Sequence, residues 1–424
     1  MTDKIIALLN KAEGVSDYRI NTTRTESMEL FFVHKNLETV RSTDTTDTGV
    51  TVYVEHDGVL GEASFMVYAS YDDEKIAEEI EKAKSKAGII SNQLYSLPTN
   101  DEALFESDSN LKEYSPEGLA ALVAKACFEA DNVENGGINA LEIFIYKDTI
   151  SVRNSRGINK TETKYRAMIE AIPTYNGEES VELYEQYNFT EFDYDEIKKE
   201  IAEKMAQVRD RYYAKAPEKK LDCPVVLCAE ELRQLIFELA SELNFSSVYS
   251  HANAFSVGDE IQKNATGDKL NVTMCSKIKG STRSANFDAD GLALTDRKVI
   301  ENGKALAYYG STRYAQYLDK EATGALGCIL VEKGTLTKSE LCGAPYFRCA
   351  SMSGLQVDIY NDYIGGEVRL GYYFDGEREI PVTSVSISGK LSEALSTLRL
   401  SNEVTTTGAY SGPELALIGG AKIV

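Results

Sequence analysis

The feature that most constrains the fold is a series of β-prone segments joined by hairpin turns rather than by helices. In the first part of the chain these segments are residues 28–35, 38–43, 49–56 and 59–68. Asp57-Gly58 separates the last two, and such a dipeptide is a strong hairpin signal because a type I′ turn needs positive φ at both positions. Similar dipeptides later in the chain are Asn302-Gly303 and Asp375-Gly376. Consecutive hairpins predict antiparallel sheets and an α+β fold class.

The two halves of the chain differ in how strands and helices are combined. Charged helices are predicted at 72–88 and 193–215, a further helix at 116–131, and short helices near 311–319 and 391–398. Strands followed by an acidic helix occur twice in the first half, which suggests an internal duplication. Residues 216–223 have the composition of a linker. We therefore predict an N-terminal α+β domain with flanking helices at 1–218 and a β-rich C-terminal domain at 219–424.

The charge of the chain excludes several classes of partner. The 424 residues include 45 basic and 67 acidic side chains, which gives a formal net charge of −22. Nucleic acids and anionic membranes are bound mainly by Lys and Arg, so neither is an expected partner. No apolar stretch approaches the ~20 residues of a membrane span. The seven cysteines are scattered without a C-x-x-C motif, as in proteins with reduced thiols. These features predict a cytoplasmic protein.

The segment LRQLIFELASELNFSS, residues 232–247, is predicted to be a helix with one apolar face. Glu238 and Glu242 lie one turn apart at the edge of that face. Two such carboxylates can bind a hard metal ion or act as acid and base. A solvated charged flank is the commoner arrangement for two helical glutamates, and it is what we expect here.

The residues alone predict no catalytic constellation. The three histidines, His34, His56 and His251, lie far apart in the sequence, so a three-histidine zinc site would have to recruit all of them from distant segments. The nucleophile elbow G-x-S-x-G and the phosphate-binding motifs G-x-G-x-x-G and G-x-x-x-x-G-K-[ST] do not occur.

Five segments in order along the chain resemble the TldD/PmbA family, also called peptidase U62 or "modulator of DNA gyrase" proteins. They are residues 29–64, ISVRNSRG at 150–157, the segment FDADG…IENG within 287–318, VTSVSISGKLSEAL at 382–395 and GAYSGPELALIGG at 408–420. Members of the TldD kind are similar to zinc metallopeptidases, with a His-Glu-x-x-x-His helix and a later cysteine ligand. Members of the PmbA or TldE kind lack these ligands and pair with TldD.

The resemblance places Phe237 at the first histidine, Glu238 at the glutamate, Glu242 at the second histidine and Thr407 at the cysteine. All three ligand positions are changed. Phe has no ligand atom and Thr is a poor zinc ligand. The resemblance thus implies the PmbA/TldE kind, no zinc and no other cofactor in this chain, and zinc in a TldD-like partner.

The function implied is that of a non-catalytic subunit in a TldD/TldE-type metallopeptidase complex. Such a complex processes unstructured peptides, by leader removal or by degradation of small proteins. One alternative is a stand-alone peptidase that uses Glu238 and Glu242, with Asp288 or Asp290, on a metal that prefers carboxylates. The other is a homodimeric binding protein without catalytic activity.

Overall fold

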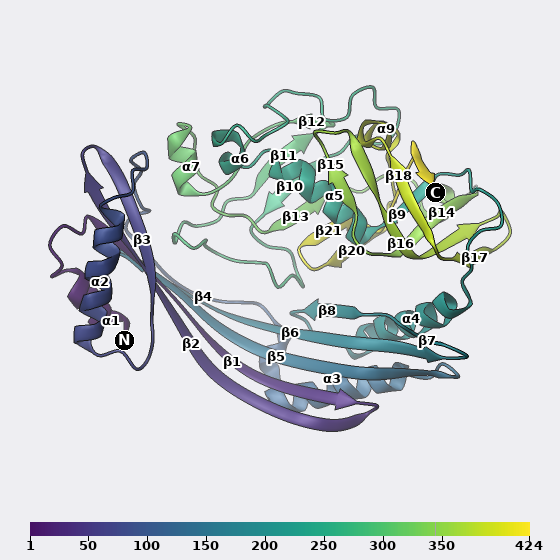
Figure 1. Cartoon of the computed structure of the whole chain (residues 1–424), viewed down its shortest axis with the longest axis horizontal. Coiled ribbons are helices and arrows are strands. Elements are labelled where there is room, and N and C mark those ends of the chain that lie inside the picture. The colour runs from purple at the N-terminus through teal and green to yellow at the C-terminus, as the bar shows by residue number, and fades with distance from the viewer. Residues whose placement is uncertain (344) are drawn as a thin grey trace.

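The structure, a computed structural model, describes residues 1–343 and 345–424 and has a mixed α+β architecture. Figure 1 shows a long curled sheet in the N-terminal half, with the strand-rich C-terminal half above its inner face. No helix in the described part of the chain is both long and apolar enough to cross a membrane. The predicted α+β class is confirmed.

The N-terminal half is built on one eight-stranded sheet of order β3-β2-β1-β5-β6-β4, with β7 and β8 also paired to β6. Its strands are β1 (Asp17–Val33), β2 (Asn36–His56), β3 (Val59–Val67), β4 (Asp101–Glu106), β5 (Gly136–Asn154), β6 (Ile158–Asn176), β7 (Ser180–Glu182) and β8 (Glu185–Phe189). Its helices are α1 (Thr2–Leu9), α2 (Asp73–Ala87), the 3-10 turn η1 (Asn110–Glu113), α3 (Pro116–Ala130) and α4 (Tyr194–Tyr213).

Alternation along β1 decides which face of this sheet meets the helices. Tyr18 and Ile20 pack with α1 and α2, and Met28 and Leu30 pack with α3, so the even-numbered side chains face the helices. Successive side chains of a strand point to opposite faces. Odd-numbered residues such as Arg19 therefore face away from these helices, towards the C-terminal half.

In the C-terminal half the described residues form a six-stranded sheet, a nine-stranded sheet and five helices. The strands are β9 (Val225–Cys228), β10 (Val272–Cys275), β11 (Arg297–Glu301), β12 (Lys304–Ala305), β13 (Cys328–Val331), β14 (Tyr346–Met352), β15 (Gln356–Asp358), β16 (Tyr363–Phe374), β17 (Glu379–Val382), β18 (Val385–Gly389), β19 (Arg399–Leu400), β20 (Val404–Thr407), β21 (Tyr410–Pro413), β22 (Leu415–Ile418) and β23 (Ala421–Ile423). The helices are α5 (Ala229–Ser241), α6 (Phe245–Tyr249), α7 (Thr312–Tyr317), α8 (Lys338–Leu341) and α9 (Leu391–Thr397). One apolar core joins both sheets to α5.

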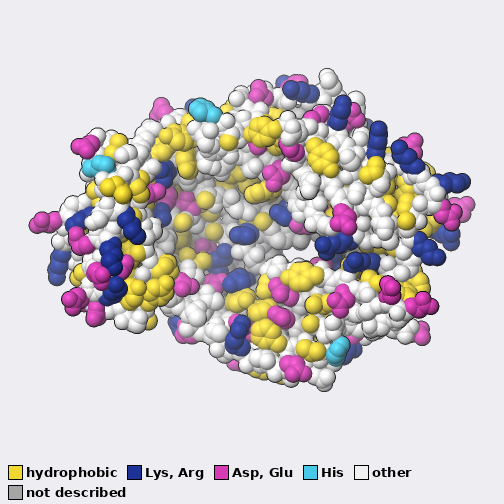
Figure 2. All heavy atoms as spheres, viewed as in Figure 1, with side chains coloured by type: hydrophobic (Ala, Val, Ile, Leu, Met, Phe, Trp, Pro, Cys, Tyr) yellow, Lys and Arg dark blue, Asp and Glu magenta, His cyan; other side chains and the backbone are white. Residues whose placement is uncertain are grey.

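Polar contacts and a small apolar cluster join the two halves. Arg19 forms an ion pair with Asp290. The side-chain amide of Asn286 donates to Oε1 of Glu162 at 2.8 Å. Beside them Val152, Ile158 and Phe287 form a buried cluster. Figure 2 shows that the surface is hollowed between the end that holds α1 and α2 and the C-terminal half.

Several predicted elements need correction. The predicted strands 38–43 and 49–56 are one strand, β2, and β1 begins eleven residues before the predicted residue 28. The sheets are not wholly antiparallel, because the pairs β4–β6, β9–β14 and β13–β21 are parallel. The Asp57-Gly58 turn is confirmed, since both residues have positive φ, 49° and 78°. The domain boundary at residue 218 remains a prediction.

Candidate functional site

The helix predicted at 232–247 is interrupted. α5 ends at Ser241, and α6 starts at Phe245. The amide groups of Leu243 and Asn244 bond three residues back, to the carbonyls of Ala240 and Ser241, so the chain tightens there before it turns. α5 is fixed in the C-terminal half because its apolar stripe is buried in the core. The stripe consists of Leu232, Leu235, Ile236, Leu239 and Ala240, and Leu243 continues it just beyond the helix; none of these side chains has exposed surface.

The positions that correspond to the family motif have different surroundings. Phe237 is 46% exposed, and Glu238 is also exposed; the side-chain oxygens of Glu238 have no hydrogen-bond partner in the described residues. Glu242 is only 9% exposed. The expectation of a solvated carboxylate is therefore confirmed for Glu238 and wrong for Glu242.

Glu242 is buried because it anchors the loop that follows α6. Its Oε2 accepts a hydrogen bond from the backbone N–H of Ala254 and lies 3.2 Å from the hydroxyl of Tyr360. The Tyr360 hydroxyl also lies 2.8 Å from the carbonyl oxygen of Ala252. The carboxylate thus holds a loop and a tyrosine in place, which is a structural role.

Thr407 is the last residue of β20, in a hairpin whose two-residue turn includes Gly408 at φ 53°. α5 packs beside this hairpin, so the structure brings the helix and the Thr407 position into one region. The side chain of Thr407 is half-buried and has no side-chain hydrogen bond in the described residues.

The residues at these positions do not fit a zinc ion. Phe237 has no donor atom, Thr407 offers only a neutral hydroxyl, and the Glu242 carboxylate is engaged by Ala254. No group of three His, Cys, Asp or Glu side chains among residues 1–343 and 345–424 is placed to hold a metal ion. His34 and His56 lie just beyond one end and at the other end of β2, and His251 follows α6.

The acidic loop 287–291 has a structural role and is not arranged as a metal-binding loop. Asp288 accepts hydrogen bonds from the amides of Asp290, Leu292 and Ala325, at 2.9, 3.1 and 3.2 Å. Burial and the neighbouring Asp290 raise the pKa of Asp288 to about 6. Asp290 itself is paired with Arg19. Asp288 thus shapes its own loop and Asp290 joins the two halves, so both carboxylates are engaged within the chain.

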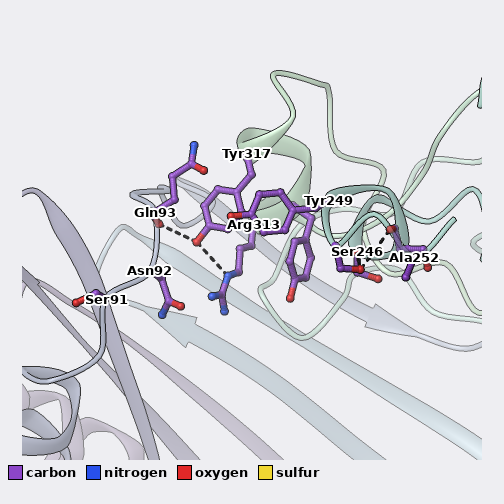
Figure 3. Close-up of a pocket in the computed structure, with 11 residues that line it drawn as sticks. Ser91, Asn92, Gln93, Ser246, Tyr249, Ala252, Arg313 and Tyr317 are labelled. Atoms are coloured by element: carbon purple, nitrogen blue, oxygen red, sulfur yellow. Dashed lines mark hydrogen bonds between the residues drawn. The ribbon is translucent and has the colours of Figure 1, made fainter.

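A cavity of about 450 Å³ lies where α6 and α7 meet the N-terminal half. It is lined by Ser91, Asn92, Gln93, Ser246, Ser247, Tyr249, Ser250, Ala252, Arg313, Tyr314 and Tyr317. Figure 3 shows that these side chains come from three separate segments of the chain. The sequence analysis missed this cavity. Its only local signal is a segment rich in tyrosine, with four tyrosines between residues 308 and 317.

Comparisons with known proteins bear on this region. Residues 220–423 match the family model described as the PmbA/TldA metallopeptidase C-terminal domain. A curated protein from Haemophilus influenzae, described as a Metalloprotease PmbA homolog, is 24% identical over 185 residues. That match covers 41% of this chain and 40% of the length of the relative.

Two crystal structures share the whole fold. TldE from Thermococcus kodakarensis superposes with a TM-score of 0.81 at 17% identity, over 100% of this chain and 99% of that one. A protein from Thermotoga maritima described as a modulator of a DNA gyrase superposes with a TM-score of 0.79 at 16% identity, again over 100% and 99%. At these identities the likeness establishes the fold alone. The whole chain thus shares the fold of these two structures, and its residues 220–423 are similar to the C-terminal domain of PmbA/TldA metallopeptidases.

Proposed function

We propose that this chain is the non-catalytic, TldE-like subunit of a TldD/TldE-type metallopeptidase complex that acts on unstructured peptides. The observation that carries the proposal is the state of the motif positions on α5. Phe237 and Glu238 face outward without polar partners in the described residues, and Glu242 is bonded to Ala254 of its own chain. A metal-bound water cannot be generated by such a set, so hydrolysis is assigned to a zinc-bearing partner of the TldD kind.

The edge of the sheet beside α5 supports a role in peptide binding. β20 is the last strand of the six-stranded sheet, and its residues alternate between exposed and half-buried. An exposed edge strand can pair with an extended peptide through main-chain hydrogen bonds, which do not depend on the peptide's sequence. This mode suits a substrate that is unfolded. We keep a cytoplasmic location as part of the same proposal.

A stand-alone carboxylate peptidase has less support. It would need Glu238 and Glu242 to act with Asp288 or Asp290. Glu242 and Asp288 are both engaged by backbone amides, and Asp290 is paired with Arg19. A homodimeric binding protein has no specific observation in its favour and is one outcome of the test below.

The test is reconstitution. We would purify this chain and a family member with an intact His-Glu-x-x-x-His helix and follow cleavage of an unstructured peptide by each alone and by the mixture. We expect no cleavage by this chain alone, a heteromeric peak in gel filtration and cleavage that rises sharply on mixing. Cleavage by this chain alone, abolished by Glu238→Gln, would overturn the proposal. A stable homodimer that neither binds nor activates the catalytic relative would favour a binding protein instead.

A further inference from the structure

The cavity at α6 and α7 has one charged lining residue, Arg313, which enters it from α7. Its Nε donates to the hydroxyl of Tyr317 at 3.1 Å, and that hydroxyl donates to the carbonyl oxygen of Gln93 at 2.7 Å. Its Nη1 donates to Oε1 of Glu62 at 2.6 Å. The guanidinium also lies 5.6 Å from the ring centres of Tyr95, Tyr314 and Tyr317. These contacts fix the position of Arg313.

The remaining nitrogen, Nη2, has no hydrogen-bond partner in the described parts of the chain. In Figure 3 the guanidinium of Arg313 and the ring of Tyr249 point to the same side, with Asn92 opposite them. The side chains of Ser91, Asn92, Tyr249 and Tyr314 likewise make no side-chain hydrogen bond within residues 1–343 and 345–424. The cavity therefore presents a fixed cationic donor, an amide and three hydroxyls. Among the described residues that line it there is no carboxylate, and the carboxylate of Glu62 bonds Nη1 of Arg313 and not Nη2.

These hydrogen-bond donors suit a ligand that has an anionic acceptor group next to a flat or apolar group. A guanidinium whose position is fixed loses little entropy when it binds a carboxylate, and such bonds are stronger than neutral ones. The rings of Tyr249 and Tyr314 lie 5.6 Å apart and offer apolar surface. The volume lies in the range of small-ligand sites. The net charge of −22 repels anions at long range. At physiological ionic strength, salt screens this repulsion over ~8 Å.

We propose that this cavity binds the C-terminal residue of a peptide, with the carboxylate on Nη2 of Arg313 and the side chain against Tyr249 and Tyr314. The proposal rests on the proposed function in one respect, that the ligand is a peptide. It adds that this chain selects peptides with a free C-terminal end. The cavity lies beside the loop that Glu242 anchors, since Ala252 lines the cavity and Ala254 is bonded to Glu242.

The first experiment is calorimetric titration of this chain, without any partner, with three short peptides. They are N-acetyl-Ala-Ala-Phe with a free carboxylate, the same peptide as its C-terminal amide, and N-acetyl-Ala-Glu-Phe amide, which carries its carboxylate on a side chain. We expect saturable binding of the free acid and about tenfold weaker binding of both amides, from the loss of a charge-assisted hydrogen bond. Equal binding of acid and amide, or no binding of the acid, would overturn the proposal. Equal binding of the glutamate peptide would overturn the assignment to a C-terminal carboxylate.

Three variants test the cavity, and the first two separate ligand binding from the ion pair that joins the two halves. Arg313→Gln removes both the free donor and the ion pair with Glu62 and is expected to abolish measurable binding. Glu62→Gln removes the same ion pair but leaves the guanidinium, so binding of the acid should stay or strengthen. Tyr249→Ala, at a side chain that is 38% exposed, should weaken binding several-fold without affecting the fold. If Glu62→Gln weakened binding as much as Arg313→Gln, the effect would be structural and the proposal wrong.

This test is independent of the reconstitution experiment. Peptide binding is measured on the chain alone, whereas the proposed function is measured as hydrolysis on mixing with a catalytic relative. Loss of acid selectivity with intact activation on mixing would remove only the cavity proposal, and selective binding without activation would remove only the subunit proposal.

Discussion

The inward and outward faces of α5 have opposite surroundings. The inward face carries Leu235 and Leu239, which have no exposed surface. The outward face carries Phe237 and Glu238, which are exposed. The inward face joins the two sheets of the C-terminal half in one core, so the packing of the helix does not depend on the residues of its outward face.

The largest expected effect contrasts the two faces directly. Leu239→Ala removes a side chain from the core between the sheets and should lower the free energy of unfolding by about 2–5 kcal/mol. Phe237→Ala removes a half-exposed ring and should cost less than about 1 kcal/mol. Urea denaturation followed by circular dichroism measures both. Similar losses in the two variants would mean that Phe237 is covered, for example by a partner.

A second contrast lies in the first turn of α5. Glu231 is buried, and burial raises its pKa from 4.5 to about 7, whereas Glu230 is exposed and paired with Arg233. Because the folded state holds the proton more tightly, Glu231 lowers stability progressively as pH rises from about 4.5 to 7, by about 3 kcal/mol in total. Glu231→Gln should remove this loss of stability. The free energy of unfolding of the variant should therefore exceed that of the wild type by more at pH 8 than at pH 5.

Unfolding free energies of the wild type and of Glu231→Gln at the two pH values give the comparison. Glu230→Gln is the matched control, since it removes one charge from the same helix turn at an exposed position. A difference between wild type and Glu231→Gln that does not change with pH would contradict the buried state assigned to Glu231.

A third contrast separates the two glutamates of the motif. Glu242→Ala leaves the amide of Ala254 without its acceptor and frees Tyr360, so it should lower the free energy of unfolding by about 1–3 kcal/mol. Glu238→Ala should change it by less than about 0.5 kcal/mol, because no partner in the described residues is lost. Thermal denaturation of both variants is sufficient. A larger loss for Glu238→Ala would show that the outward face is involved in the fold after all.

Local signals in the sequence predicted much of the fold. The helices predicted at 72–88, 116–131 and 193–215 are α2, α3 and α4, and the Asp57-Gly58 and Asn302-Gly303 turns follow from the need for positive φ. The first part of β1 was missed because residues 21–27, NTTRTES, are polar. That stretch is a strand because β2 and β5 pair with it on both sides, which no local pattern reveals.

The candidate site was predictable only in part. The substitutions at Phe237, Glu238, Glu242 and Thr407 follow from the family resemblance, and the exposure of Glu238 follows from helical periodicity. The burial of Glu242 does not, because its partners lie 12 and 118 residues further along the chain. The cavity around Arg313 depends on contacts between segments more than 60 residues apart, such as that between the rings of Tyr249 and Tyr317, and so it required the structure.

Whether the end of α5 holds a metal ion is tested most directly by the metal content of the purified chain. Elemental analysis after gel filtration at neutral pH should find far less than one zinc, manganese or other transition metal per chain, and Glu238→Ala and Glu242→Ala should not change the value. About one metal ion per chain, lost in either variant, would contradict the account and make this chain a catalyst in its own right.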